Sequence, residues 1–272
     1  MQPGENEEAD GGACLRALYA ASGGLHAVFG DKVADYQASR PDYPAALFEQ
    51  LAQGLGAEAA IGDLGAGTGL LTEGLLARGW RVCAIEPNEG MRAACDRRLG
   101  GRPGYRSAAG SAEAVPLPAA SLDLLTAAQA FHWFEIEAAR AEALRVLKPG
   151  GQVALIWNDR RDDTPLHRAL NEIFARHGGA RRDALLAAED RGQLDRFFLS
   201  ASPPQQWQWP HSHRLDARGL LSLAFSRSYM PRPDSPAGQA AAAELLALFE
   251  RLVEADGRVE VAYTTVLFLG RP

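Results

Sequence analysis

Three alternate glycines and two carboxylates are spaced as in a site that binds a nucleotide. Gly65, Gly67 and Gly69 follow Asp63 at the end of an apolar run, and Glu86 ends the next apolar run. Glycines permit a tight turn and a close approach of the backbone to a ligand. A carboxylate about 20 residues further on can accept hydrogen bonds from both hydroxyls of a ribose. The pattern therefore predicts a nucleotide-binding strand-turn-helix-strand unit.

The glycine spacing decides between classes of nucleotide. Dinucleotide-binding loops read G-x-G-x-x-G, which would require a third glycine where this chain has Leu70. The loop lacks that fingerprint, which argues against an NAD-dependent oxidoreductase. Simpler interpretations remain open: the glycines could form an ordinary turn, and Glu86 could cap the helix that begins after Pro87.

A second group of chemically able side chains follows the apolar run 122–128. Gln129 and His132 lie where open α/β sheets bind ligands, beyond the carboxyl end of a strand. Histidine is the side chain best suited to act as a base near neutral pH, so His132 is the candidate catalytic residue. A hydrogen-bonded structural histidine is the alternative, and the neighbouring aromatic residues Phe131, Trp133 and Phe134 are expected to pack.

The elements that must position these residues alternate between strand and helix patterns. Helices are expected over 68–78, 88–99, 136–147, 166–177 and 244–253, and strands over 122–128, 152–157, 205–215 and 260–269. Such alternation implies a parallel sheet covered by helices on both faces. The last strand pattern, rich in Val and Thr, suits an antiparallel strand closing one edge.

Motifs along residues 29–157 resemble those of the class I S-adenosylmethionine-dependent methyltransferases, in particular the type 11 small-molecule branch similar to trans-aconitate methyltransferases. The resemblance implies a Rossmann-like, seven-stranded, mostly parallel sheet with one antiparallel edge strand and a cap insertion. The motifs are Y-x-x-x-R-P at 36–41, D-L-G-A-G-T-G at 63–69, G-S-A-E-A-V-P-L-P at 110–118, the run 121–134, and L-R-V-L-K-P-G-G at 144–151.

The same resemblance implies roles for individual residues. Asp63 would face the ammonium of the cofactor, Glu86 its ribose, and Ser111 its adenine, although many relatives carry Asp where Ser111 stands. Tyr36 and Arg40 would fold over the cofactor, and His132 would face the substrate. The implied cofactor-binding residues are Tyr36, Arg40, Asp63, Gly65, Gly67, Gly69, Glu86, Pro87, Met91, Ser111, Ala112, Glu113 and Gln129. Solvated surface positions are the alternative for the Tyr36 and Ser111 segments.

Composition and charge limit the binding partners, the location and the metal sites that can be expected for this chain. The formal net charge of −6 gives no general attraction for nucleic acid or anionic membrane. Three cysteines and an acidic start favour a reducing cytoplasm, and no Cys or acidic partner accompanies the alternating Trp and His of 207–213, so no metal site is expected. Residues 1–24 are predicted to form a flexible acidic arm, and residues 25–272 a methyltransferase domain whose substrate cap comes from about 160–230.

These observations predict a methyltransferase that uses S-adenosyl-L-methionine, acts on an oxygen of a small molecule and releases S-adenosylhomocysteine. An N- or C-methyltransferase of a small metabolite, or a non-catalytic protein that binds the cofactor, would share most of the sequence pattern. Methylation of nucleic acid or protein amides is disfavoured, because Gln129-Ala130-Phe131-His132 replaces the Asn/Asp-Pro-Pro-aromatic run typical of those enzymes. The sequence leaves the acceptor and the oligomeric state open.

Overall fold

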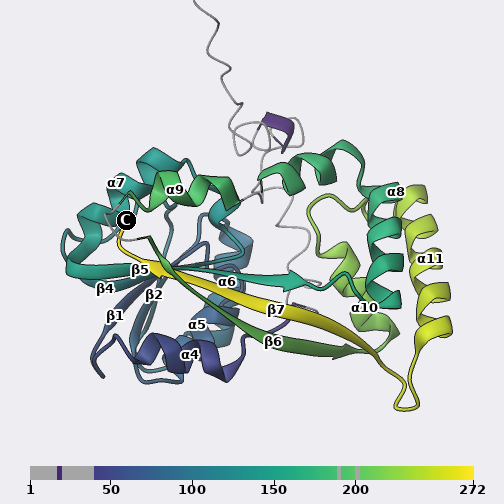
Figure 1. Ribbon diagram of the computed structural model, residues 1–272, viewed down its shortest axis with the longest axis horizontal. Coiled ribbons are helices and arrows are strands. Elements are labelled where there is room, and N and C mark those ends of the chain that lie inside the picture. The colour runs from purple at the N-terminus through teal and green to yellow at the C-terminus, as the bar shows by residue number, and fades with distance from the viewer. Residues whose placement is uncertain (1–16, 20–39, 189–190, 200–202) are drawn as a thin grey trace, which may run out of the picture.

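The computed structural model describes residues 17–19, 40–188, 191–199 and 203–272. Seven strands among these residues form one sheet in the order β3-β2-β1-β4-β5-β7-β6, drawn in Figure 1. This confirms the expected Rossmann-like fold class. The strands are β1 Ala60–Leu64, β2 Arg81–Ile85, β3 Tyr105–Ala108, β4 Leu122–Ala128, β5 Leu147–Arg160, β6 Gln205–Leu215 and β7 Val259–Gly270.

The first five strands are parallel. β1 pairs with β2 and β4, β2 pairs with β3, and β4 pairs with β5. Because the carboxyl ends of parallel strands meet at one edge, the loops after β1, β2 and β4 come together there. The glycine loop, Glu86 and Gln129 are thus carried to the same place by three different strands.

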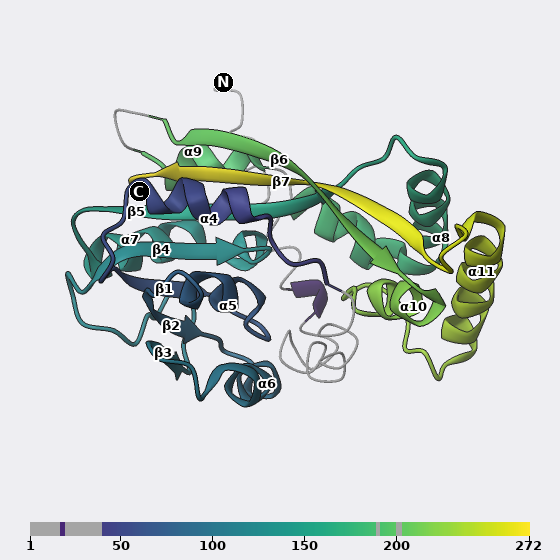
Figure 2. The same ribbon diagram turned by 90° about the horizontal axis from the view of Figure 1, so that it is seen from below.

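Two helical layers cover the parallel sheet, as the alternation along β5 makes plain. Val153 and Leu155 of β5 join the core under α7, whereas Ala154 and Ile156 join the core on the opposite face. Figure 2 shows α4 and α5 along one side of the strands. The covering helices are α4 Ala45–Ala52, α5 Leu70–Leu76 and α6 Glu89–Leu99 on one face, and α7 Ile136–Val146 and α9 Leu194–Phe197 on the other.

The antiparallel strand β7 lies between β5 and β6 and is antiparallel to both. β6 therefore forms the outer edge of the sheet. The sequence pattern had placed the strand over 260–269, which is β7, at that edge. The predicted bounds of β6, 205–215, are confirmed. Strands β5, β6 and β7 run on beyond the parallel strands toward a separate group of helices (Figure 1).

These helices form what we call the cap: α8 Pro165–Ala188, α10 Ala217–Phe225 and α11 Pro236–Leu252, with the far ends of β6 and β7. They share a third hydrophobic core that includes Phe174, Leu223, Leu245 and Val261. The cap thus reaches beyond the range of about 160–230 expected from sequence, because α11 packs in it. Two short 3-10 helices, η1 Phe131–Trp133 and η2 Arg191–Gln193, complete the described elements.

Several elements are longer than their sequence patterns indicate. β5 begins at Leu147 rather than Gln152, since its pairing with β4 is irregular and absorbs the predicted Pro-Gly-Gly turn. α8 continues past His177 across a kink at Gly179, where φ is 53°. α11 begins at Pro236, eight residues before the predicted start at Glu244.

Most of the predicted flexible arm lies outside the described residues, as does Tyr36. Within the arm, residues 17–19 are helical, and Tyr19 is fully buried in the cap core, where its hydroxyl donates to Ser228 Oγ at 2.8 Å. Tyr19 belongs to the run 15–20, the part of this segment whose sequence is also compatible with a helix. No helix of the described part of the chain is long and apolar enough to cross a membrane.

Candidate active site

The glycine loop follows β1 with all three glycines in the left-handed region, at φ values of 65°, 56° and 86° for Gly65, Gly67 and Gly69. A Cβ on Gly65 would lie 2.7 Å from the Cβ of Ala130, and one on Gly69 would lie 2.7 Å from Cys95 Sγ. The first glycine therefore allows close approach to the segment after β4. The third allows α5 to pack against α6, and it does not line the cavity described below.

Asp63, at the end of β1, is 1% exposed and lies beneath the loop. Its carboxylate accepts hydrogen bonds from Thr72 Oγ1 at 2.6 Å and from Thr126 Oγ1 at 2.8 Å. Burial raises the pKa of Asp63 to about 6, although both hydrogen bonds favour the charged form. The side chain ties α5 and β4 to β1, and its contact with a cofactor ammonium stays a prediction.

Glu86, just after β2, is 7% exposed and lies against the loop. Its Oε2 accepts a hydrogen bond from the amide of Gly67 at 2.9 Å, and its Oε1 accepts one from the amide of Asn88 at 2.8 Å. The alternative role at the start of α6 is taken by Asn88, whose side chain accepts from the amide of Met91 at 2.9 Å. Glu86 thus joins the glycine loop to the start of α6 through its two carboxylate oxygens.

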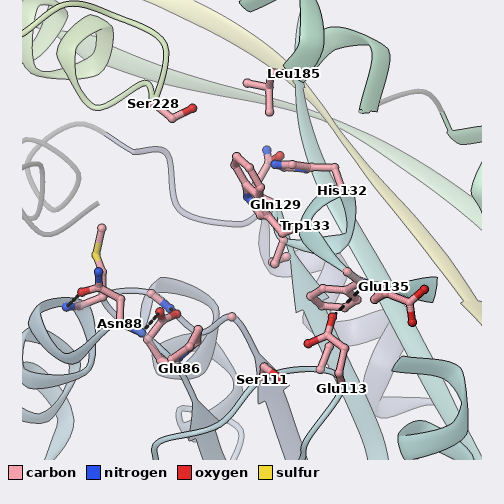
Figure 3. A pocket seen from close by; sticks show the side chains of 18 of the residues that line it. Glu86, Asn88, Ser111, Glu113, Gln129, His132, Trp133, Glu135, Leu185 and Ser228 are labelled. Atoms are coloured by element: carbon pink, nitrogen blue, oxygen red, sulfur yellow. Dashed lines mark hydrogen bonds between the residues drawn. The ribbon is translucent and has the colours of Figure 1, made fainter. Parts of the chain in front are cut away.

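One cavity of about 380 Å³ joins these parts, and we call it the glycine-loop cavity (Figure 3). Glu86 and Asn88 line one side, His132 and Gln129 lie near the middle, and Leu185 and Ser228 enter from the cap. Of the residues expected from sequence, the cavity is lined by Arg40, Gly65, Gly67, Glu86, Pro87, Met91, Ser111, Ala112, Glu113, Gln129 and His132.

Gln129 has a backbone conformation that L residues seldom adopt. It has φ 56° immediately after β4, and its side-chain Nε2 donates to the carbonyl of Asn158 at 3.1 Å. Strain of this kind persists only where surrounding contacts impose it, and it is concentrated at functional sites. The turn fixes the direction of the chain as it enters η1, which carries His132.

His132 is 9% exposed, and its Nδ1 is buried without a hydrogen-bond partner among the described residues. Burial, with the positive charge of Arg40 second, lowers the pKa of His132 to about 3. The imidazole is therefore neutral at physiological pH. Arg40 also links the site to the cap, since its Nη2 donates to the carbonyl of Ser226 at 3.5 Å.

The segment 111–113 forms a short bridge at the cavity wall. Ser111 pairs with Ala114 in an isolated antiparallel bridge, and Ala112 is 4% exposed. Glu113 Oε1 accepts from the amide of Glu135 at 2.9 Å, so its carboxylate holds this loop against the start of α7.

Sequence reasoning missed other residues that line the cavity. Asn88 was predicted only as the first residue of a helix, and Trp133 and Phe134 only as packing residues. The cap contributes Leu185, Arg227, Ser228 and Tyr229, for which no motif gave a signal. Glu135 also lines the cavity, at the cap of α7.

A sheet of this strand order, with a glycine loop after β1 and an acidic residue after β2, defines a Rossmann-like fold of the kind that binds nucleotides. The model of the methyltransferase domain family matches residues 62–155. An uncharacterized methyltransferase of Mycobacterium tuberculosis is 35% identical over 201 residues, which cover 74% of this chain and 76% of the relative. The chain belongs to the S-adenosylmethionine-dependent methyltransferases.

Two further comparisons describe the extent of the similarity. A solved protein of Anaeromyxobacter dehalogenans, provisionally named a type II methyltransferase, superposes with a TM-score of 0.60 at 24% identity and covers 85% of this chain and 97% of its own. It shows the same fold. The malonyl-[acyl-carrier protein] O-methyltransferase of Methylococcus capsulatus is 40% identical over 96 residues, 34% of each chain.

Proposed function

We propose that the protein transfers a methyl group from S-adenosylmethionine to an oxygen of a small-molecule acceptor. The observation that carries this proposal is the continuity of the glycine-loop cavity, which runs from Glu86 to His132 and on to cap residues Leu185 and Tyr229. A cavity of about 380 Å³ that is partly enclosed by a cap is suited to a small ligand. The net charge of −6 disfavours nucleic acid as the acceptor.

The residues of the cavity fit the cofactor. The backbone at Gly65 lies so close to the segment after β4 that a Cβ there would clash with Ala130. The Glu86 carboxylate lies against the same loop. Glu86 would hold the ribose, Met91 and Ala112 would pack against the adenine, and Gly67 would pass the methionine moiety. When bound, S-adenosylmethionine supplies an electrophilic methyl group.

The protein itself aligns the acceptor with the cofactor, excludes water and determines which protonation state of the acceptor can react. Because the pKa of His132 is about 3, the imidazole is a weak base in this environment. It can still hydrogen-bond to an acceptor oxygen. A carboxylate oxygen is already ionised at neutral pH and needs no base, so this environment favours a carboxylate over a hydroxyl acceptor.

The relative from Methylococcus capsulatus supports transfer to oxygen, because its name describes an O-methyltransferase of a malonyl group. Its similarity covers only 96 residues, 34% of each chain, so it does not define the acceptor. The finer resemblance to trans-aconitate methyltransferases and a location in the cytoplasm remain predictions. An N- or C-methyltransferase, or a protein that binds the cofactor without turnover, remains the alternative.

The test is formation of S-adenosylhomocysteine from S-adenosylmethionine with a panel of carboxylic acids, followed by mass spectrometry. The expected product is a methyl ester of at least one acid, with turnover lost in Glu86→Ala. A product methylated on nitrogen or carbon would replace the oxygen proposal. Tight cofactor binding without turnover on carboxylate, hydroxyl or amine panels would favour the non-catalytic alternative.

A further inference from the structure

A second cavity of about 580 Å³ adjoins the glycine-loop cavity, and we call it the arginine cavity. The two share Arg40, Gln129, Leu185, Arg227 and Tyr229 in their linings. Five guanidinium groups and two carboxylates line the second cavity. They are Arg40, Arg160, Arg182, Arg191, Arg227, Asp159 and Asp162.

Arg160, the last residue of β5, has hydrogen-bonding capacity that the protein does not use. Its Nη2 donates to Asn171 Oδ1, but its Nε and Nη1 are buried and have no partner among the described residues. The guanidinium carbon lies 4.9 Å from the centre of the Phe174 ring, and that of Arg227 lies 4.8 Å from the same ring. Two cations are thus held around one buried aromatic side chain.

Neither carboxylate of the cavity forms an ion pair with Arg160 among the described residues. Asp159 is paired with Arg191 at 2.5 Å, and Asp162 is exposed and forms no ion pair with Arg160 among the described residues. Burial, and then the charge of Arg227, lowers the pKa of Arg160 to about 9. His167, which also lies near Arg160, is fully buried, and burial lowers its pKa to about 4, so it adds no negative or positive charge at neutral pH.

Tyr263 of β7 adds a second unused donor. It is the register partner of Arg160 across the antiparallel β5–β7 pair, and it lines the same cavity. The residue is 4% exposed, and its hydroxyl is buried without a hydrogen-bond partner among the described residues. Buried charges and hydroxyls without partners are costly unless a ligand satisfies them.

We propose that the arginine cavity binds an anionic group of the methyl acceptor, a carboxylate or a phosphate, through Arg160 and Tyr263. A guanidinium with free Nε and Nη1 presents the paired donors that bind two oxygens of such a group, and the tyrosine hydroxyl donates to the same group. Because the cavities share a wall, an anion held there leaves the rest of the acceptor beside Gln129 and His132. This inference rests on the proposed function and specifies its substrate class.

The test uses the full chain saturated with S-adenosylhomocysteine, and calorimetric titration with citrate, with inorganic phosphate and with uncharged glycerol. The parent should bind citrate or phosphate and not glycerol. The more tightly bound of the two anions identifies the group as carboxylate or phosphate. Arg160→Gln should weaken anion binding at least about tenfold, and Tyr263→Phe by about threefold to tenfold.

Matched variants separate binding from structure. Arg251→Gln makes the same change at an exposed arginine of α11 outside both cavity linings, and it should leave the anion affinity unchanged. Tyr263→Phe removes a buried hydroxyl that has no partner, so its melting temperature without anion should equal or exceed that of the parent. A lower melting temperature would mean that the hydroxyl has a structural role.

Equal anion affinity in the parent, Arg160→Gln and Tyr263→Phe would overturn the proposal, as would failure of both anions to bind the parent. Affinity for S-adenosylhomocysteine, measured in each variant, should stay within about threefold of the parent and verifies that the site is folded. If anions bind through Arg160 but no acceptor is ever methylated, the proposed function fails and the anion site stands.

Discussion

The body of the protein, built on the parallel strands β1 to β5, and the cap differ in how far apart in the sequence their cavity residues lie. In the body, the ends of β1, β2 and β4 carry a loop, a carboxylate and a strained turn, all within a short stretch of sequence that a pattern can describe. In the arginine cavity beside the cap, Arg160, Arg227 and Tyr263 come from three distant segments and share no motif. The proposed cofactor contacts are thus encoded locally, whereas the proposed acceptor contacts depend on long-range packing.

A substitution in the glycine loop should cause the largest loss of folding stability and of cofactor affinity. Gly65→Ala should destabilise the protein by about 2–5 kcal/mol, because Ala is strained at positive φ and its Cβ meets that of Ala130 at 2.7 Å. Cofactor binding should be lost with it. Denaturant unfolding and calorimetry measure the two effects.

The matched control is Gly257→Ala, where φ is 75° and no atom lies within 4 Å of the new Cβ. It shares the backbone strain without the contact, so it should cost only about 1–2 kcal/mol and leave cofactor affinity intact. Similar losses of cofactor affinity in both variants would mean that the close approach after β4 is unimportant.

Glu86→Ala should weaken cofactor binding by about 2–3 kcal/mol, because it removes charged acceptors for the ribose and frees the amide of Gly67. Glu86→Gln keeps the shape of the side chain and loses its charge, so its cofactor affinity should lie between those of Glu86→Ala and the parent. Calorimetry with S-adenosylhomocysteine provides the measurement. Unchanged affinity in Glu86→Ala would remove this residue from the cofactor site.

The comparison also explains what the sequence could predict. The sequence pattern identified β4 and β6 to the residue, because β4 is a short apolar run after a Pro-rich loop and β6 alternates along its length. α11 was predicted too short, since its first half is rich in alanine and lacks large apolar residues, although the Ser235-Pro236 pair marked its start. Arg160 could not be recognised, because its partner Tyr263 is fixed only by the β5–β7 register.

The neutral histidines predict how stability depends on pH. A histidine whose folded pKa lies below its unfolded value of about 6.5 stabilises the fold above that pH, and the contribution is lost as pH falls toward the folded pKa. For His132 that window runs from about 6.5 down to about 3, and for His167 down to about 4. Acid should therefore destabilise both the active site and the cap.

Asp63 acts in the opposite sense, since its pKa is raised to about 6 and its protonation favours the fold as pH falls below that value. Between pH 6.5 and 5, each histidine should lower the free energy of unfolding by about 2 kcal/mol, and Asp63 should offset part of this loss. The slope of unfolding free energy against pH should decrease in His132→Gln and in His167→Gln. An unchanged slope in both would mean that neither histidine is held neutral.

Two helix caps provide the smallest and most specific test of the separation between the regions. Asn88 caps α6 beside the glycine-loop cavity by accepting from the amide of Met91 at 2.9 Å, and Ser235 caps α11 by accepting from the amide of Gly238 at 3.0 Å. Replacing either residue by Ala should cost about 1 kcal/mol of stability, because each substitution leaves an amide at the start of a helix without its acceptor.

Only Asn88→Ala should also weaken cofactor binding, since Asn88 lines the cavity and its side chain fixes the helix start whose backbone amide donates to Glu86 Oε1 at 2.8 Å. Ser235→Ala should leave that affinity unchanged and accelerate amide exchange in α11. Calorimetry and hydrogen exchange on the two variants measure these effects side by side. If Ser235→Ala weakened cofactor binding as much as Asn88→Ala does, the cap and the body would be coupled, and recognition of the acceptor would then depend on the same cooperative unit as recognition of the cofactor.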